Sequence, residues 1–568
     1  MPASEPAASP APAADPPVGP PASPPVVSRA RPRLLGWVLP AAAGLAAVIL
    51  ALGVAELTAA FVAPQASPVL VVGSQLIDWA PAWAKQTAIA LFGTGDKAAL
   101  LTGIAIALVV VSGAAGALEH WKSPIGRILI GAAGVFGVGA AIARSGSSPA
   151  DIIPAVVATV VALIALGYLL RKLDERPRPR PINPASLRSA GSSRPQSTAT
   201  AEAAAAQRAA AERVSRRRFL GLSAGAAVVG ALALAGGYAL EAGARAAAAA
   251  RTALKLPAPS VKAPAVPAGA ELDIPGLAKV VSSNADFYRI DTALQVPQLD
   301  PTQWELKITG MVEKPITVSF AELLALPLEE SYTTLMCVSN EVGGNLIGNA
   351  KWLGHPIRHL LARAKPMAAA DMVLSRSSDG FTASTPLSVL QDDRNAILAV
   401  GMNGDPLPPE HGYPVRMVVP GLYGYVSATK WVVELEVTRF ADRTAYWTDR
   451  GWSAHGPVKL ESRIDVPRAG ASVTPGPVVV AGVAWHQHNG IQKVEVRVDG
   501  GDWNEAQLAT AISADTWVQW RWDWDASAGH HQLEVRATDA TGATQTADIA
   551  DTVPNGATGY HVIPLNVG

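Results

Sequence analysis

The segment 34–170 is almost free of charged side chains, and this constrains the fold more than any other feature of the chain. It holds four apolar runs, at Leu34–Val62, Ala98–Leu118, Ile125–Ala143 and Ile152–Leu170. Each run is close to the roughly 17–25 residues that a helix needs to cross a bilayer. Frequent glycine and alanine would let such helices approach closely in lipid. We therefore predict a four-helix transmembrane region over 34–170.

Basic residues predict the orientation of these helices. Arginines precede the first run, Lys122 and Arg127 lie between the second and third, and a basic group follows the fourth at 171–180. Positive charge gathers in cytoplasmic loops, so the N-terminus is expected in the cytoplasm. The other loops hold less positive charge, and in the loop 64–97 Trp79 and Trp83 suit the membrane interface.

Glu56 is an acidic residue inside the first apolar run. An ionisable group within a membrane span often marks a functional site, because burying its charge is costly. The sequence offers no obvious partner for it. We slightly favour a snorkelling or helix-packing role.

A second membrane signal lies after a polar, basic linker at 171–215. The run Ser215-Arg216-Arg217-Arg218-Phe219-Leu220-Gly221, followed by apolar Leu222–Leu240, resembles a twin-arginine export signal, with Gly221 where lysine is usual. A stop-transfer helix is the plainer alternative, and it predicts the same topology. We favour the twin-arginine interpretation and an uncleaved fifth span at 216–245. The chain after residue 275 would then lie outside the cytoplasm.

The remaining boundaries follow from composition. The segment 1–33 is rich in Pro, Ala and Ser and is predicted to be disordered, and 246–275 reads as a Pro/Ala linker. Residues 276–450 mix short strands and helices without a βαβ repeat, which indicates an α+β domain. Its expected elements are strands at Trp304–Ile308 and Val432–Val437 and helices at Phe320–Leu326 and Ile357–Ala364.

Residues 451–568 read as an all-β, immunoglobulin-like sandwich. Valines 494, 496 and 498 alternate with charged residues, and Asp499-Gly500-Gly501-Asp502 is typical of a hairpin turn. Val518, Trp520, Trp522 and Trp524 share one face of a strand, which would supply much of the core. The fold class is therefore an α-helical membrane anchor, an α+β domain and a β-sandwich.

Composition excludes several functions. The 46 basic and 46 acidic side chains balance, so no nucleic-acid partner is indicated. One cysteine among 568 residues excludes an intrachain disulfide, a CxxC site and c-type haem attachment. Before residue 350 the only histidine is His120, so a bis-histidine haem in the membrane has no ligands. Electrons crossing the spans would need another protein or a quinone.

The single cysteine, Cys337, ends a strand-like run and opens into the loop Val338-Ser339-Asn340-Glu341-Val342-Gly343-Gly344-Asn345. Glycine lets such a loop approach a ligand closely. Three roles remain open for the thiol: an inert buried group, a nucleophile, or a thiolate bound to a soft metal.

A second signal runs from His411 to Trp431, where a strand delivers Arg416 and a glycine-rich loop leads to Lys430. Arginine, lysine and backbone N–H groups converging on one loop suit a phosphate or pyrophosphate. A hairpin with surface charges explains the same pattern equally well.

Together, Cys337 with its loop, the Trp352-Leu353-Gly354 turn and the run from His411 to Lys430 resemble the molybdopterin domain of the sulfite oxidase family. Residues 284–440 correspond to that domain. Residues from about 457 to 568, ending in Pro554-Asn555-Gly556-Ala557-Thr558-Gly559, resemble the family's immunoglobulin-like dimerisation domain, which implies a possible homodimer.

The resemblance implies a molybdenum-molybdopterin cofactor, with Cys337 as the protein ligand of the metal. Phe287-Tyr288-Arg289 match the segment that approaches the cofactor, and Arg289 would orient the substrate. The residues implied to hold the pterin and its phosphate are His411, Arg416, Ser427, Ala428, Thr429 and Lys430. Ser375 or Asp379 is implied as a further pterin contact.

Two departures from the family concern the substrate. Sulfite-oxidising members carry an arginine where this chain has Val342, and a tyrosine near the position of Trp452. Losing a buried cation from an anion pocket costs about a few kcal/mol. A neutral oxo compound such as a sulfoxide, or another small oxyanion, therefore fits at least as well as sulfite.

The predicted function is oxygen-atom transfer on a small extracytoplasmic substrate by a membrane-anchored molybdenum oxidoreductase. The electrons of the reaction would pass to or from an external carrier or a quinone. Membrane lipid would surround the anchor. The alternative is a non-catalytic, membrane-anchored scaffold that keeps the fold without the cofactor. His486 and His488 could hold a metal, but a solvated or dimer-facing strand is the simpler interpretation, and His530-His531 reads as a surface turn.

Overall fold

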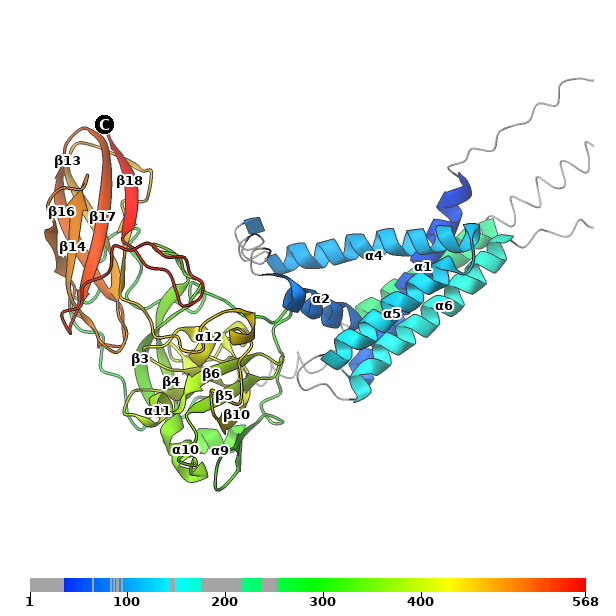
Figure 1. Ribbon diagram of the computed structural model, residues 1–568, viewed down its shortest axis with the longest axis horizontal. Helices are drawn as coiled ribbons and strands as arrows, with labels where there is room; N and C mark the ends of the chain where they lie inside the picture. Colours follow the sequence, from blue (N-terminus) through cyan, green and yellow to red (C-terminus); the bar gives the residue numbers. More distant parts are fainter. Residues whose placement is uncertain are drawn as a thin grey trace, which may run out of the picture.

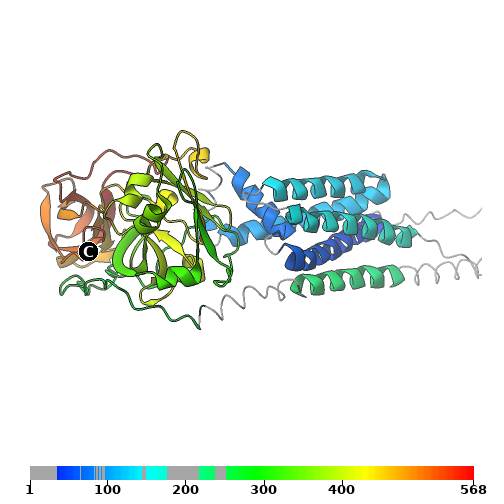
Figure 2. The same ribbon diagram turned by 90° about the horizontal axis from the view of Figure 1, so that it is seen from below.

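The computed structural model describes residues 35–63, 66–81, 96–143, 149–174, 217–236 and 253–568, with residues 84, 87, 91–92 and 251 between them. In Figure 1 these residues form a bundle of helices and a larger body built mostly of strands, and Figure 2 shows the two in contact from a second side. The segments 1–33 and 175–216, which include the predicted disordered terminus and most of the basic linker, lie outside the described residues.

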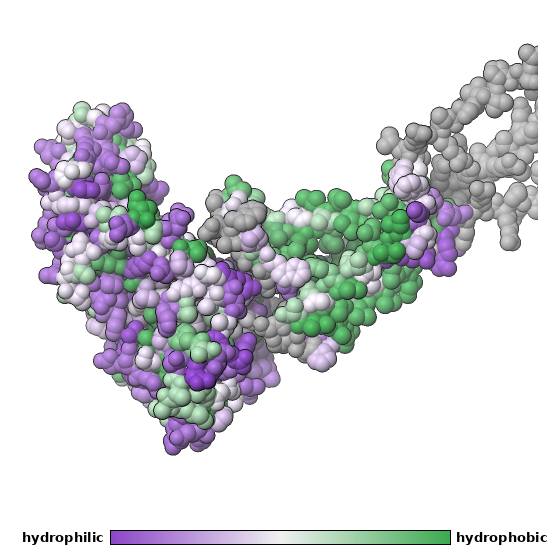
Figure 3. Space-filling model, viewed as in Figure 1, coloured by the Kyte–Doolittle hydropathy of each residue, from purple (hydrophilic) through white to green (hydrophobic). Residues whose placement is uncertain are grey.

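Five of the described helices are long and apolar enough to cross a membrane. They are α1 (Leu35–Val62), α4 (Asp96–Trp121), α5 (Ile125–Ala143), α6 (Ile153–Asp174) and the helix over Arg217–Gly236. Figure 3 shows apolar residues on the outside of this bundle, whereas the strand-rich body is mainly hydrophilic. An apolar exterior is suited to lipid. The described residues of the four predicted runs, and of the fifth at 217–236, are thus helical.

Glycines set the closest helix contacts in the bundle. A Cβ added to Gly44 of α1 would lie 2.1 Å from the carbonyl oxygen of Ser112 in α4. A Cβ added to Gly53 would lie 2.2 Å from the carbonyl oxygen of Gly230 in the fifth helix. The expected role of glycine is therefore met at two crossings of α1.

The predicted loop 64–97 contains an additional helix, α2 (Pro68–Trp79), which is too short to cross a bilayer. Just before it, the Ser67 hydroxyl donates a hydrogen bond of 2.6 Å to Glu56. The Glu56 side chain is buried, so it lies inside the bundle and does not snorkel. Trp79 ends α2 with its ring exposed, and Trp83 lies outside the described residues.

The α+β domain contains two five-stranded sheets. The first has the order β2-β1-β10-β5-β6, and only the β1–β10 pair in it is parallel. The second has the order β3-β4-β7-β8, with β9 also on β7. The strands of the first sheet are β1 (Glu305–Gly310), β2 (Ile316–Ser319), β5 (Met372–Ser377), β6 (Thr382–Pro386) and β10 (Val432–Thr438). Those of the second are β3 (Glu329–Met336), β4 (Ile347–Pro356), β7 (Ile397–Met402), β8 (Asp405–Pro406) and β9 (Arg416–Val418).

Four short helices connect these strands. They are α9 (Phe320–Ala325), α10 (Ile357–Ala364), α11 (Leu387–Gln391) and α12 (Gly424–Ser427). Helix α9 begins where predicted, because Ser319 and Glu322 form a reciprocal capping box. The expected turn at Trp352-Leu353-Gly354 is wrong. These residues lie inside β4, where the pairing with β7 shifts register between Leu353 and Gly354.

The C-terminal domain is all β, as predicted. Its eight strands follow the order β11-β13-β16-β15-β14-β17-β18-β12. They are β11 (Glu461–Val466), β12 (Ser472–Val473), β13 (Gly476–Trp485), β14 (Ile491–Val498), β15 (Asn504–Leu508), β16 (Val518–Ala526), β17 (Gly529–Asp539) and β18 (His561–Val567). Trp520 and Trp524 are buried in its core, and the Asp499-Gly500 turn has φ values of 50° and 71°.

The two soluble domains meet along a hydrogen-bonded seam. The backbone amide of Trp517 donates to the Thr334 hydroxyl at 2.9 Å, and the Trp517 indole donates to the Val280 carbonyl at 2.9 Å. The predicted linker 246–275 is not free in its described part. Gln519 of β16 accepts from the Leu272 amide at 2.8 Å and donates to Glu271 at 3.0 Å.

Candidate functional site

Cys337 is the first residue after β3. Its amide donates to the Leu346 carbonyl at 2.9 Å, and the buried Asn340 side chain closes the loop by accepting from the Leu346 amide at 2.7 Å. Gly343 in this loop has φ +78°, and a Cβ there would lie 2.2 Å from the ring of His561 in β18. This glycine therefore serves the contact between domains rather than the approach of a ligand that we expected.

One cavity brings together most of the residues implied by the resemblance. Its wall includes Phe287, Tyr288, Cys337, His411, Arg416, Ala428 and Lys430. These residues come from separate segments, which only the folded domain brings together. The thiol thus faces the same space as two buried basic side chains, and not an apolar interior.

Aromatic rings fix one side of this cavity. Phe287 stacks on Tyr288 with 5.2 Å between ring centroids, and it meets Trp352 and His411 edge-on at 5.6 and 5.5 Å. The Arg416 guanidinium lies 5.0 Å from the centroid of the Trp352 ring. This cation–π contact orients the arginine without neutralising it.

Arg416, on β9, is a buried cation with only 5% of its surface exposed. Its guanidinium donates to the backbone carbonyls of Met417, His411 and Ala428, and to no carboxylate among the described residues. Burial lowers the pKa of Arg416 to about 10, so it remains charged at neutral pH. Burial and the neighbouring Arg416 charge lower the pKa of His411 to about 4, which keeps this imidazole neutral.

Lys430 pairs with a carboxylate that the sequence pattern did not reveal. Its ammonium lies 2.8 Å from Asp291 and 3.0 Å from the Glu410 carbonyl. Burial lowers the pKa of Lys430 to about 8, with Asp291 opposing the shift. Burial alone would raise the pKa of Asp291, but Lys430 and Lys97 hold it well below its usual range. Asp291 follows Arg289 by two residues, so in an extended chain the two side chains lie on the same side. This spacing was the one feature of the sequence that could have indicated an Arg289–Asp291 pair.

Three predicted residues lie outside the cavity wall. The Arg289 side chain is 40% exposed and pairs with Asp291 at 3.0 Å. The buried Ser427 hydroxyl donates to the Tyr423 carbonyl at 2.9 Å, and the Thr429 hydroxyl contacts that of Ser375 at 2.7 Å. Ser427 and Thr429 therefore support the loop from behind, and the cofactor contacts assigned to all three remain predictions.

Four aromatic side chains also line the cavity, namely Phe381, Tyr425, Trp447 and Trp452, and its wall includes the carboxylate-bearing Asp379. Trp452 lies 6.0 Å from Tyr425 and 6.2 Å from Trp447, measured between ring centroids. Of the two positions where a departure was noted, Trp452 thus belongs to the cavity wall and Val342 does not.

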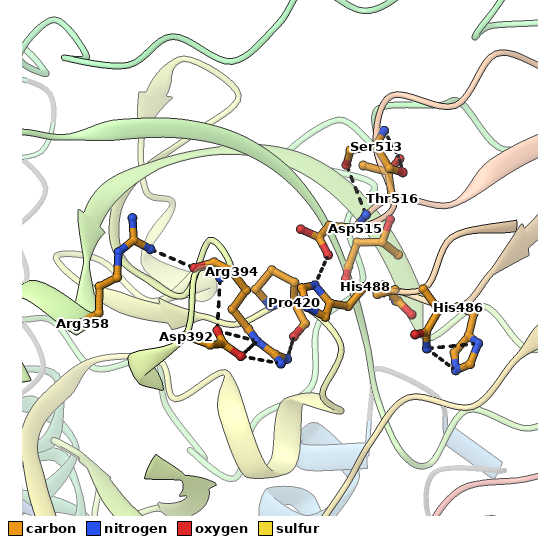
Figure 4. A network of polar contacts seen from close by, with 12 residues as sticks. Arg358, Asp392, Arg394, Pro420, His486, His488, Ser513, Asp515 and Thr516 are labelled. Carbon is orange, nitrogen blue, oxygen red and sulfur yellow. Dashed lines mark hydrogen bonds and ion pairs between the residues drawn. The ribbon is translucent and has the colours of Figure 1, made fainter. Parts of the chain in front are cut away.

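The histidines outside the cavity make other contacts. The segment from His486 to His488 is a turn after β13 and not the strand we expected. His486 contacts Asp539 at 2.8 Å, and His488 contacts Asp515 at 3.2 Å in the network of Figure 4. His531 contacts Asp499 at 2.7 Å. Across the part of the chain that the structure describes, no three or more His, Cys, Asp or Glu side chains are grouped to hold a metal ion.

Comparison with known families assigns both soluble domains. Residues 293–447 match the oxidoreductase molybdopterin binding domain, and residues 461–535 match a bacterial Ig domain. The first match falls within the predicted α+β domain, and the second within the predicted sandwich.

Individual relatives agree with this assignment. The mitochondrial sulfite oxidase of Rattus norvegicus is 30% identical over 258 residues, which is 38% of this chain and 47% of that protein. The chain therefore spans about half the length of this relative. The uncharacterized oxidoreductase YuiH of Bacillus subtilis is 32% identical over 157 residues, which is 28% of this chain and 76% of that protein. The structure of the sulfane dehydrogenase SoxCD from Paracoccus pantotrophus aligns with a TM-score of 0.45 at 24% identity, over 51% of this chain and 84% of that one.

Proposed function

Because the chain belongs to the sulfite oxidase family of molybdopterin-dependent oxidoreductases, we propose that it performs oxygen-atom transfer on a small extracytoplasmic substrate. The family's cofactor is molybdenum-molybdopterin. One observation carries the proposal: Cys337, Arg416 and Lys430 line the same cavity. A thiolate ligand and two cations for a phosphate are the groups that such a cofactor requires.

The residues of the cavity fit this cofactor. A buried guanidinium that bonds only to carbonyls lacks the anion that would compensate its charge, and a phosphate supplies one. The Ser339 amide donates to the Cys337 sulfur at 3.5 Å, which favours a thiolate. Burial raises the pKa of the Cys337 thiol, and a bound metal cation would offset that effect.

When bound, the cofactor supplies a metal that changes oxidation state by two electrons as an oxygen atom is transferred. Cys337 would hold the metal, while Arg416 and Lys430 would hold the anionic end of the pterin. Burial raises the pKa of Tyr288 far above its usual range, so its phenol keeps its proton beside Cys337. Tyr288 can therefore donate a hydrogen bond into the cavity at any physiological pH.

The aromatic part of the cavity wall favours a neutral oxo compound as substrate. Phe381, Trp447 and Trp452 supply this aromatic surface. A sulfoxide would bury its apolar groups against these rings, whereas sulfite would find less compensation for its charge. Sulfite and other small oxyanions are the competing substrates.

The membrane part supports a catalytic domain outside the cytoplasm. In the part of the chain that the structure describes, five apolar helices are long enough to cross a membrane, and five crossings from a cytoplasmic N-terminus lead to an extracytoplasmic C-terminal part. Electrons would then pass to or from an external carrier or a membrane quinone. The Ig-like domain is the proposed homodimer contact.

Metal analysis of the full-length protein tests the proposal. We expect about one molybdenum and one pterin per chain after expression in a cofactor-competent host. Cys337→Ser should lower metal content and turnover by more than about 100-fold, since it removes the proposed ligand. A panel of sulfite, sulfoxides and chlorate-like oxyanions then ranks the substrates. A wild-type protein without molybdenum, or a Cys337→Ser variant that keeps it, would favour the non-catalytic scaffold.

A further inference from the structure

The segment Ile290–Leu294 lies between the cofactor cavity and the membrane helices. Asp291 and Thr292 belong to the cavity wall. On the other side, Lys97 at the start of α4 pairs with Asp291 and donates to the Ala293 carbonyl at 2.5 Å. Leu294 packs on α2, where a Cβ added to Gly73 would lie 2.7 Å from the Leu294 side chain. The membrane helices therefore touch the wall of the cavity directly.

The Asp291 carboxylate is shared between the two parts of the protein. Its side chain is only 3% exposed, one oxygen binds Lys97, and the other binds Lys430 at 2.8 Å and Arg289 at 3.0 Å. A carboxylate divided among three cations neutralises none of them fully. Lys430 therefore keeps charge and donor capacity for a ligand in the cavity.

Lys97 stands at a helix end where a cation is otherwise unfavourable. It is the second residue of α4, and the partial positive charge of a helix N-terminus repels an ammonium group. Pairing with the buried Asp291 offsets that repulsion. The contact thus has an electrostatic reason on both sides.

We propose that Lys97 is a positioning residue for the cofactor site: by holding Asp291, it leaves Lys430 available to the anionic end of the cofactor. The inference rests on the proposed function and adds that the membrane helices complete the site in addition to anchoring it. Without Lys97, Asp291 would turn further toward Lys430 and neutralise it.

The first test uses three variants of the full-length protein in detergent micelles. In Lys97→Ala we expect molybdenum to be released to a chelator about 10-fold faster than from wild type, as for other residues that orient a metal site indirectly. Lys97→Arg keeps the charge and should restore slow release. Lys122→Ala removes an exposed lysine at the opposite end of α4 and should behave as wild type. The electron paramagnetic resonance spectrum of the metal should change only in Lys97→Ala.

The second test disturbs the contact without changing any charge. Gly73→Phe would push α2 away from Leu294, whereas a Cβ at Gly103 of α4 has no neighbour within 4 Å, so Gly103→Phe is the matched control. We expect Gly73→Phe to release molybdenum faster, as Lys97→Ala does, and Gly103→Phe to leave release unchanged.

The outcomes separate this inference from the proposed function. If wild-type protein holds no molybdenum, the proposed function fails. If wild type holds it, and Lys97→Ala and Gly73→Phe hold it as tightly with the same spectrum, only the role of Lys97 is overturned. Should Lys97→Ala not fold, as judged by size-exclusion chromatography, the two glycine variants still decide between these results.

Discussion

The cofactor cavity and the seam between the soluble domains both bury ionisable groups, but they handle charge differently. In the cavity, Arg416 stays charged although its guanidinium donates only to backbone carbonyls among the described residues and packs on an aromatic ring. In the seam, Glu461 at the start of β11 is 2% exposed, and neither carboxyl oxygen has a hydrogen-bond partner in the structure. Burial raises the pKa of Glu461 to about 8, with Lys459 opposing, so this side chain is mostly protonated at pH 7.

The two groups differ in whether they can become neutral by gaining or losing a proton. A carboxylate can bind a proton and become neutral, whereas a guanidinium in a protein cannot lose one at physiological pH. A buried glutamic acid without a partner therefore indicates only a protonated side chain. A buried arginine without a carboxylate indicates an anion that belongs beside it.

Arg416→Met is the strongest way to break this comparison. We expect cofactor affinity to fall by about 10- to 100-fold, because the anion loses its buried partner. The thermal stability of cofactor-free protein should stay equal or rise, since an uncompensated charge is no longer buried. Metal content and thermal unfolding measure the two effects. Arg376→Met is the matched control, because Arg376 is partly exposed and paired with Glu434 at 3.2 Å. Unchanged cofactor binding in Arg416→Met would show that this cation has no anionic partner.

Glu461→Gln tests the other side through pH. The folded pKa of about 8 lies above the ordinary 4.5, so the folded protein binds this proton more tightly than the unfolded chain does. Stability from this group is fully present below about pH 4.5 and is lost as pH rises through about 8, by on the order of a few kcal/mol. A glutamine side chain does not ionise in this pH range, so the Glu461→Gln variant should not lose this stability as the pH rises. The melting temperature of the variant should exceed that of wild type at pH 8.5 and match it near pH 5. If the melting temperatures of wild type and variant differ by the same amount at every pH from 5 to 8.5, Glu461 is not protonated in the folded protein.

Thr334→Val should have the smallest effect. It keeps the shape of the side chain but leaves the Trp517 amide without its 2.9 Å acceptor, which costs about 1–3 kcal/mol. Chemical denaturation should detect the loss, while metal content stays at the wild-type value. Thr317→Val, at the exposed position of β2, should change stability by less than about 0.5 kcal/mol. A Thr334→Val variant that also loses metal would mean that the seam and the cavity are coupled.

Local patterns predicted the parts of the molecule that depend on neighbouring residues. Apolar run length identified the long apolar helices, alternation identified strands such as β14, and the Ser319–Glu322 spacing fits the start of α9. The family resemblance implied the part of the cavity wall that includes Cys337, Arg416 and Lys430. The run-length, alternation and capping signals each lie within a few residues of the feature that they predict.

The features that were missed depend on distant segments. Asp291 matters because Lys97, 194 residues earlier, reaches it, and no local pattern contains that contact. Asp291 also pairs with the partly exposed Arg289 side chain at 3.0 Å, and the role of Arg289 at the metal remains a prediction. The predicted linker is packed because Gln519 of the sandwich bonds to Glu271 and Leu272. Such contacts form when the domains assemble, and the secondary-structure propensity of the local sequence does not predict them.

The contact between Gly343 and His561 has a consequence for biosynthesis. The loop after the candidate metal ligand is completed by a ring from the last strand of the chain, β18. The ribosome synthesises Gly343 well before His561, which lies 218 residues further along the chain (561 − 343), so the ring cannot be placed until β18 has been made and has folded. The loop therefore reaches its final shape only after the Ig-like domain has formed, and loading of the metal site should wait for that domain.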